Sequence, residues 1–155
     1  MSLDSVRRFL AEAAPDLEIL VSGSSTATVA LAASAHGVAP GRIAKTLSLR
    51  VGARVILLVA SGTARLDNRK AKAAFGGRLK LLDADEVEQV TGHPVGGVCP
   101  FGLAMPLPVY CDVSLQAHDE VLPAAGSPNT AVRIAPVRLA ALTGASWVDV
   151  CQDMP

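Results

Sequence analysis

The stretch Gly96-Gly97-Val98-Cys99-Pro100-Phe101-Gly102 is the most distinctive part of the sequence. Its glycines and proline are incompatible with a regular helix or strand, because glycine permits positive φ and proline fixes φ and removes a donor. The apolar side chains of Val98 and Phe101 indicate that the loop packs against the body of the protein. An ordered loop of this composition presents main-chain N–H groups to a ligand, so we expect a binding site here.

Length and composition indicate a single domain over residues 1–155. Half of the residues are hydrophobic but only 3% are aromatic, so the core must consist of Val, Leu, Ile and Ala. No apolar run approaches the ~20 residues of a membrane span. Acidic residues near the start, Asp4, Glu12, Asp16 and Glu18, argue against a secretory signal. We therefore expect a cytoplasmic protein without a membrane partner.

The cysteines and histidines do not form a recognisable ligand set. The cysteines are Cys99, Cys111 and Cys151. An odd count argues against a disulfide scaffold, and no CxxC or HxxxH spacing occurs. We expect neither a metal nor a cofactor.

The charges are unevenly distributed although the net charge is zero. Residues 42–80 contain many basic side chains and Asp67 as the single acid, whereas residues 81–120 contain acids without Lys or Arg. Such a basic segment can form a phosphate-binding face. A solvated surface with cross-strand ion pairs is an equally good interpretation.

Periodicity and turn residues predict an α+β domain with a mixed order of elements. The expected helices cover residues 6–13, 28–36, 67–75, 83–91 and 136–143. The expected strands cover residues 17–21, 43–51, 54–60, 79–82, 108–113, 120–125, 130–135 and 147–150, with 120–125 and 130–135 joined as a pair. We expect a mixed, mostly antiparallel sheet or a partly closed barrel, flanked by helices.

Lys45 is the most informative single residue because its strand position places it on the same face as Leu47 and Leu49. An unpaired inward lysine carries a large desolvation cost. Lys45 can lie at the strand end and extend its amine to water, or face a cavity and bind an anion. A third interpretation pairs it with a carboxylate such as Asp67.

Two further features allow more than one interpretation. The turn Gly126-Ser127-Pro128-Asn129-Thr130 is a second glycine-bearing loop whose side chains could line a pocket. Cys99 could be a thiolate nucleophile with His93 as its base, or a small packing residue. No GxSxG, HExxH, P-loop or GxGxxG motif occurs.

Several motifs follow one another across residues 15–150. They are Ser25-Thr26-Ala27-Thr28, Ile43-Ala44-Lys45-Thr46-Leu47, Arg65-Leu66-Asp67, the stretch 91–102 and Ala124-Ala125-Gly126-Ser127. Together they resemble the YbaK/EbsC family, the aminoacyl-tRNA deacylases related to the editing domain inserted in bacterial prolyl-tRNA synthetases. The Gly-Gly-x-x-Pro-Phe-Gly loop is the most specific of these motifs.

The resemblance implies an α+β editing domain that hydrolyses mischarged aminoacyl-tRNA, with tRNA-Pro favoured and prolyl-tRNA synthetase as a further partner. It implies that water attacks the ester, helped by the free hydroxyl of the terminal ribose, without a protein nucleophile. The implied catalytic residues are Lys45, Gly96, Gly97, Cys99 and Pro100, with main-chain amides of the loop stabilising the oxyanion. The implied substrate-binding residues are Thr26, Thr28, Val98, Phe101, Gly102, Gly126, Ser127 and Asn129. The implied tRNA-binding residues are Arg65, Arg69, Lys70 and Lys72.

The sequence also departs from the family pattern. Cys99 lies within the glycine loop, and Ser127-Pro128-Asn129-Thr130 replaces a glycine- and arginine-rich version. The amino acid removed therefore stays open among Ala, Cys, Ser, Thr and 2-aminobutyrate. Two other functions stay open: a tRNA- or synthetase-binding module that has lost hydrolysis, and a Cys99/His93 thiol hydrolase.

Overall fold

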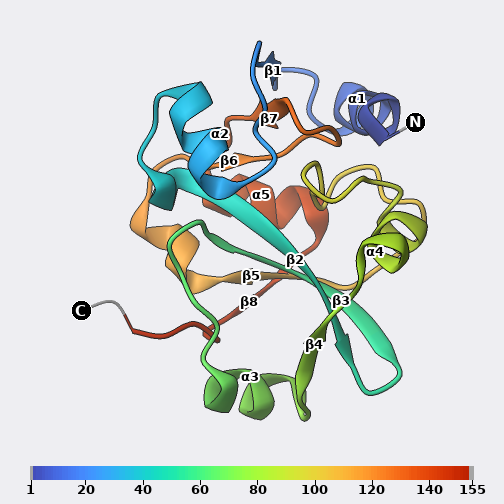
Figure 1. The fold of residues 1–155 in the computed structure, drawn as a ribbon, viewed down its shortest axis with the longest axis vertical. Helices are drawn as coiled ribbons and strands as arrows, with labels where there is room; N and C mark the ends of the chain where they lie inside the picture. Colours follow the sequence, from blue (N-terminus) through green and yellow to red (C-terminus); the bar gives the residue numbers. More distant parts are fainter. Residues whose placement is uncertain (1, 154–155) are drawn as a thin grey trace.

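The structure, a computed structural model, describes residues 2–153 (Figure 1). The strands are β1 (Ile19–Val21), β2 (Ile43–Val51), β3 (Arg54–Ser61), β4 (Leu79–Leu81), β5 (Val109–Asp112), β6 (Leu122–Pro123), β7 (Thr130–Val132) and β8 (Ser146–Val148). The helices are α1 (Ser2–Ala13), α2 (Val29–His36), α3 (Asn68–Phe75), α4 (Ala84–Thr91) and α5 (Pro136–Thr143), with the 3-10 helices η1 (Pro40–Arg42) and η2 (Val113–Ala117). Within residues 2–153, no helix has the length and apolarity that crossing a membrane requires.

Strand β2 is the centre of the main sheet because three other strands pair with it. β3 pairs with it antiparallel along its whole length, β4 antiparallel with residues 49–51, and β6 parallel with Ile43 and Ala44. The sheet order is β4-β2-β3-β5-β8, with β6 beside β2, while β1 and β7 form a separate antiparallel pair. The predicted α+β domain with a mixed sheet is confirmed, and the sheet is open rather than closed into a barrel.

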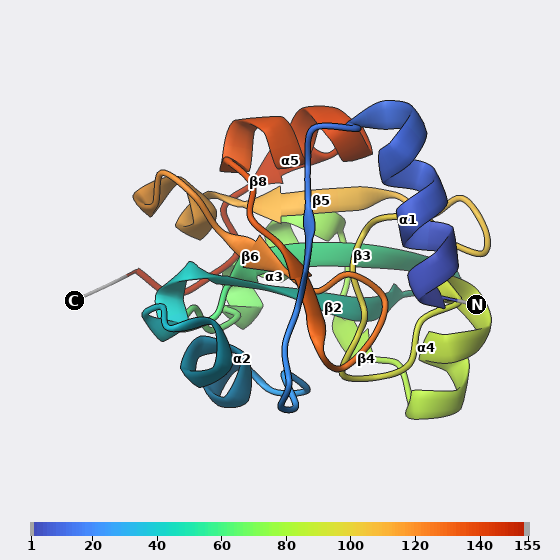
Figure 2. The ribbon, with the colours of Figure 1, turned by 90° about the horizontal axis from the view of Figure 1, so that it is seen from above.

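Helices cover both faces of this sheet. Leu49, Ile56 and Leu58 pack on α3, which lies below the sheet in Figure 1. On the other face, Leu57 and Val59 belong to the larger core, which includes side chains of α1 and α5. Figure 2 shows α5 and α2 at opposite ends of a stack with β5, β3 and β2 between them.

The helix ends follow the capping residues of the sequence. Thr28, Asp67 and Asp83 accept hydrogen bonds from the first-turn N–H groups of α2, α3 and α4. Each of the helices α2 to α5 is followed by a glycine in the left-handed region. These boundaries agree with the predicted ones within a few residues, whereas α1 begins earlier than predicted.

The predicted pairing of residues 120–125 with 130–135 is only partly correct. The two segments touch through isolated bridges, Val121 with Ile134 and Ala124 with Ala131. However, β6 makes its ladder with β2, and β7 makes its ladder with β1. The long-range partners supply more buried contact than the local turn does, so the segments separate into different sheets.

The two glycine-bearing loops pack directly against each other. The Gly126 N–H donates to the Gly97 carbonyl at 3.0 Å. A Cβ added to Gly97 would lie 2.6 Å from the Ser127 nitrogen, so no side chain fits at this position. Helix α1 closes the other side, because its Ser5 hydroxyl donates to the Gly102 carbonyl at 3.0 Å.

We predict that Gly97→Ala lowers the free energy of unfolding by about 1–3 kcal/mol, because the main chain of the neighbouring loop must move. Urea denaturation measures this loss. Gly23→Ala is the matched control: no atom lies within 4 Å of its added Cβ, so a change within about 0.5 kcal/mol is expected. Equal stability of the two variants would contradict the packing described here.

Candidate functional site

A cavity of about 290 Å³ lies between β2, α2 and the glycine loop. Val29 and Ala32 of α2, Val87 of α4 and Val98 give it mainly apolar walls. Gly96 and Val98 bring the start of the glycine loop to its edge. The cavity is large enough for a small amino acid and part of the group that carries it.

One wall of the cavity is an unpaired stretch of the outer edge of β2. β6 pairs with this edge up to Ala44, and β4 pairs from Leu49 onward. Ser48 turns its main chain to this edge, since its carbonyl accepts from the Leu82 N–H at 3.1 Å. Main-chain groups of a strand alternate in direction, so Thr46 also turns its N–H and C=O outward. No strand within residues 2–153 pairs with the main chain of Thr46 at this edge.

Four buried side-chain atoms in this cavity have no hydrogen-bond partner within the described residues. They are Thr26 Oγ1, His36 Nε2, Thr46 Oγ1 and Ser48 Oγ. Thr26 and Ser48 are 7% and 5% exposed, so water reaches them poorly. A buried polar group without a partner costs about 1–3 kcal/mol. A polar ligand in the cavity removes that cost.

The chemical states of these groups suit a neutral, hydrogen-bonding ligand. Burial lowers the pKa of His36, and the nearby Arg133 charge lowers it further. His36 is therefore a neutral imidazole at pH 7, and the three hydroxyl groups can each donate and accept.

The sequence interpretation missed Thr46, Ser48 and His36. The signal that could have found Thr46 and Ser48 was the alternation of residues 43–51. It places the polar side chains of Thr46, Ser48 and Arg50 on one face of the strand. That face was not predicted to border the site, because the open sheet edge depends on where β4 and β6 stop.

Lys45 borders the cavity, but its amine lies on the other face of the sheet from the glycine loop. Lys45 stands opposite Ala60 in the β2–β3 ladder, and Ala60 packs with Ala64 and Cys151. The amine donates to the carbonyls of Ala64 at 2.5 Å and Gly62 at 3.4 Å. Lys45, Gly96 and Val98 thus line the same cavity, while the Lys45 amine is held by main-chain carbonyls. The alternative pairing with Asp67 is wrong, since the Asp67 carboxylate caps α3.

The electrostatics of Lys45 are those of a half-buried cation beside another cation. Burial lowers the pKa of Lys45, the neighbouring Cys151 offsets part of this shift by raising the pKa, and the Arg65 charge lowers it further. No carboxylate lies within ion-pair distance of Lys45 in residues 2–153. Two neighbouring cations without an acidic partner suit an anion with several oxygens, such as a phosphate diester.

The predicted loop residues separate into a part that borders the cavity and a part that supports it. Gly96 and Val98 border the cavity. The N–H of Gly97 is already used, because it donates to the Pro94 carbonyl at 2.9 Å. The predicted oxyanion contact of Gly97 is therefore corrected. The N–H groups of Gly96 and Val98 have no partner within residues 2–153.

The rest of the loop lies beneath the cavity rather than along it. Cys99, Pro100 and Phe101 are buried, and the Phe101 ring stacks on Phe9 with centroids 5.9 Å apart. Gly102 packs on the main chain of α1. None of these four residues lines the cavity, so the catalytic and substrate contacts implied for them stay predictions.

The second loop acts in the same supporting way. Gly126, Ser127 and Asn129 do not line the cavity, so the substrate contacts implied for them stay predictions. The Ser127 hydroxyl donates to Asn129 Oδ1 at 2.8 Å, which holds the turn against Gly97. Thr26 and Thr28 both border the cavity, as predicted for substrate-binding residues.

Cys99 and His93 are close but are not a nucleophile and its base. Cys99 Sγ lies 3.6 Å from His93 Nε2. That nitrogen carries a proton, because it bonds to the Phe101 carbonyl at 2.7 Å, and so it cannot accept the thiol proton. Burial raises the pKa of Cys99 to about 12 and lowers the pKa of His93. A thiolate at neutral pH is therefore disfavoured, which argues against the thiol hydrolase.

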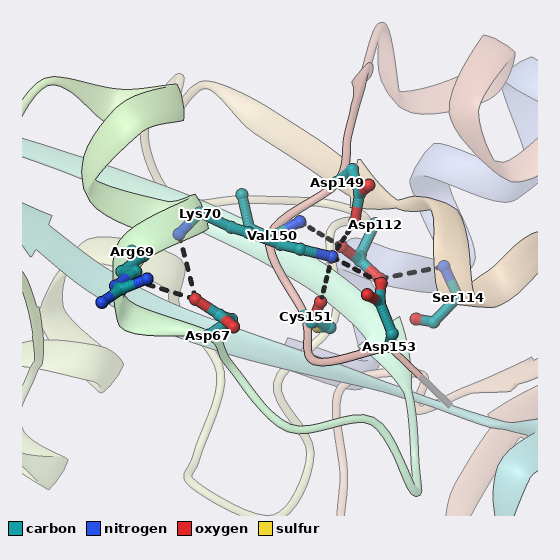
Figure 3. A network of polar contacts seen from close by, with 9 residues as sticks. All are labelled: Asp67, Arg69, Lys70, Asp112, Ser114, Asp149, Val150, Cys151 and Asp153. Carbon is teal, nitrogen blue, oxygen red and sulfur yellow. Dashed lines mark hydrogen bonds and ion pairs between the residues drawn. The ribbon is translucent and has the colours of Figure 1, made fainter. Parts of the chain in front are cut away.

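The predicted tRNA-binding residues divide between paired and unpaired cations. Lys70 donates to Asp149 and Asp153 at 3.1 and 2.8 Å, and these carboxylates raise its pKa (Figure 3). Its predicted role as a phosphate ligand is corrected. Arg65, Arg69 and Lys72 are exposed and have no ion pair in residues 2–153. Arg42 and Arg50 pair with Asp119 and Glu86, so the basic segment is in part an ordinary ion-paired surface.

Within residues 2–153, no three or more His, Cys, Asp or Glu side chains are grouped so that they could hold a metal ion.

The comparison with known families agrees with this geometry. The family model of the aminoacyl-tRNA editing domain matches residues 23–142, which include the cavity and both glycine-bearing loops. The chain belongs to the aminoacyl-tRNA editing domain family. The family predicted from the motifs is thereby confirmed.

Relatives of this editing domain extend over nearly the whole chain. The protein YwhH of Bacillus subtilis (strain 168), described as uncharacterized, is 44% identical over 155 residues and covers 99% of each chain. EbsC of Enterococcus faecalis (strain ATCC 700802 / V583), described as a candidate Cys-tRNA(Pro)/Cys-tRNA(Cys) deacylase, is 29% identical over 121 residues, which are 76% of this chain and 73% of EbsC. A crystal structure described as a candidate trans-editing enzyme for prolyl tRNA synthetase is 36% identical, with a TM-score of 0.90 and 98% of both chains covered.

We predict that the cysteines of the folded editing domain resist alkylation. All three are buried, and burial raises each pKa to about 12. After iodoacetamide at pH 8, mass spectrometry should find the native protein unmodified and the urea-unfolded protein carrying three adducts. Stoichiometric modification of native Cys99 would instead revive the thiol mechanism.

Proposed function

We propose that this editing domain hydrolyses the ester of a mischarged aminoacyl-tRNA, with tRNA-Pro as the favoured carrier. Membership of the editing-domain family supports the reaction class. The description of the related crystal structure supports tRNA-Pro as the carrier, and that of EbsC names tRNA(Pro) together with tRNA(Cys). The observation that carries the proposal is the cavity, whose wall contains unpartnered polar side chains together with Gly96 and Val98 of the glycine loop.

The glycine loop supplies the electrostatic part of the reaction. Water attacks the ester carbonyl, and the Gly96 and Val98 N–H groups stabilise the oxyanion that forms. The bond between the acyl carbon and the ribose oxygen then breaks, and the ribose oxygen takes a proton. Loss of one oxyanion donor typically costs ~3–4 kcal/mol. An already activated ester therefore needs no protein nucleophile.

Lys45 and Arg65 supply the contact to the nucleic acid. Lys45 borders the cavity and the Arg65 charge acts on it, so the two cations together bind a phosphate of the tRNA 3′ end. Such contacts position a nucleic acid without reading its sequence. Arg69 and Lys72, both exposed, extend the positive surface toward the acceptor stem.

The unpartnered hydroxyl groups in the largely apolar cavity favour an acyl group that bears a hydroxyl. Thr26, Thr46 and Ser48 offer hydroxyl groups without partners, and an apolar ligand would leave these groups unpaired. Among the small amino acids, serine and threonine satisfy them, whereas alanine and 2-aminobutyrate do not. A site built to hydrogen-bond a hydroxyl discriminates more strongly than a site that measures one methylene.

The first prediction concerns the substrate. In a deacylation screen of tRNA-Pro charged with Ala, Cys, Ser, Thr, 2-aminobutyrate and Pro, we expect Ser and Thr to be released fastest and Pro slowest. The comparison of the deacylation rates for threonine and 2-aminobutyrate is the most informative one, because the two side chains have similar size and differ in the hydroxyl. Tight binding of charged tRNA without release of any amino acid would favour the binding module instead.

The second prediction concerns Lys45. Lys45→Ala should lower deacylation about tenfold or more, since a hydrogen bond to a charged group contributes about 1.5–3 kcal/mol. Cys99→Ala, measured in parallel, should keep most of the activity, because Cys99 lies below the loop. Full activity of the first variant would remove Lys45 from the site.

The third prediction concerns selectivity. Thr46→Val replaces the hydroxyl by a methyl group, so the preference for Thr over 2-aminobutyrate should fall at least about fivefold. Thr63→Val is the control, because Thr63 is exposed and outside the cavity. An unchanged ratio in Thr46→Val would show that the hydroxyl does not contact the acyl side chain.

A further inference from the structure

Asp112 is a fully buried carboxylate whose hydrogen bonds go to main-chain donors. It ends β5 and is 0% exposed. Its oxygens accept from the Ser114 N–H and the Val150 N–H, each at 2.9 Å (Figure 3). No Lys, Arg or His lies within ion-pair distance of it in residues 2–153. A buried carboxyl group needs hydrogen-bond partners, and Asp112 finds them in two segments that are distant in sequence.

Each partner of Asp112 continues to one end of the loop that joins β3 to α3. The Ser114 hydroxyl accepts from the Ser61 N–H at 3.1 Å, at the start of the loop. The Val150 carbonyl accepts from the Asp67 N–H at 2.8 Å, at its end. One carboxylate thus secures both ends of residues 61–67.

This loop carries the groups that set the position of the cation pair. Its Gly62 and Ala64 carbonyls hold the Lys45 amine, and Arg65 is one of its residues. The Gln152 N–H donates to the Arg65 carbonyl at 2.8 Å, so the segment after β8 also fixes the middle of the loop. Lys70 fastens the same segment from outside through Asp149, Asp153 and the Cys151 carbonyl (Figure 3).

We propose that Asp112 is a positioning residue that holds residues 61–67 and thereby orients the Lys45–Arg65 pair toward the tRNA phosphate. The phosphate role of the pair rests on the proposed function, whereas the positioning of the Lys45 amine does not. Asp112 touches no substrate and acts through the loop. The cation pair is then ordered before tRNA arrives, so binding does not have to supply that order.

The first test measures the Lys45 pKa by NMR titration of its εCH₂ signal in the wild type and in Asp112→Asn. The amide of Asn can accept only one of the two N–H groups, so one end of the loop loosens. The Lys45 amine should become more exposed, and its pKa should rise toward the ordinary value of 10.5. Loss of a nearby negative charge alone would lower the pKa, so the sign separates positioning from a direct charge effect.

Two controls make this result decisive. Asp149→Asn removes a carboxylate of the outer ion pair and should leave the Lys45 pKa nearly unchanged, because Lys70 keeps Asp153 and the Cys151 carbonyl. Where Asp112→Asn does not fold, Ser114→Ala serves instead, because it removes only the bond to Ser61. An unchanged or lowered Lys45 pKa in a folded variant of either kind would overturn the proposal.

The second test is a double-mutant cycle on deacylation. Introduced alone, Asp112→Asn should reduce the deacylation rate about tenfold. Added to the Lys45→Ala variant, it should have little further effect, because both substitutions act through the Lys45 amine. Multiplicative losses would contradict the coupling. A protein without deacylase activity would refute the proposed function, while the titration would still test the positioning role.

Discussion

The site depends on a gap in the pairing of β2. Two short strands, β4 and β6, meet the outer edge of this strand at its two ends and leave residues 45–47 between them uncovered. An unpaired edge in a protein interior is unfavourable because its main-chain groups lack partners. Here the gap coincides with buried, unpartnered side chains of the same wall. The fold therefore keeps open a surface that a ligand completes.

The glycine residues explain how the second wall of the cavity comes so near to β2. Gly97 has no room for a side chain against Ser127, so the loops at 96–102 and 126–130 form one packed unit. Helix α1 supports this unit from outside through Ser5. Gly96, Val98 and Thr130 of this unit line the cavity, and the packing of the two loops holds the main chain of Gly96 and Val98 there. This arrangement explains why the sequence contains no recognisable catalytic triad.

Local sequence signals predicted the elements well and their three-dimensional partners less well. The caps Thr28, Asp67 and Asp83 and the alternation in residues 43–51 are local properties, and the structure agrees with them. The face of β2 that meets the glycine loop depends on where β4, β6 and the loop dock, which periodicity does not encode. For this reason Thr46 and Ser48 were overlooked. The ion pairs of Lys70 likewise depend on Asp149 and Asp153, which are distant in sequence.

The most direct measurement is an NMR titration of the protein with 3′-seryl-3′-deoxy-3′-aminoadenosine, in which a stable amide replaces the hydrolysable ester. The account predicts amide shift changes at Thr26, Thr46, Ser48, Gly96 and Val98, with smaller changes in α3. Binding that instead perturbs α3 and leaves residues 45–48 unchanged would contradict the claim that the open edge of β2 receives the acyl group.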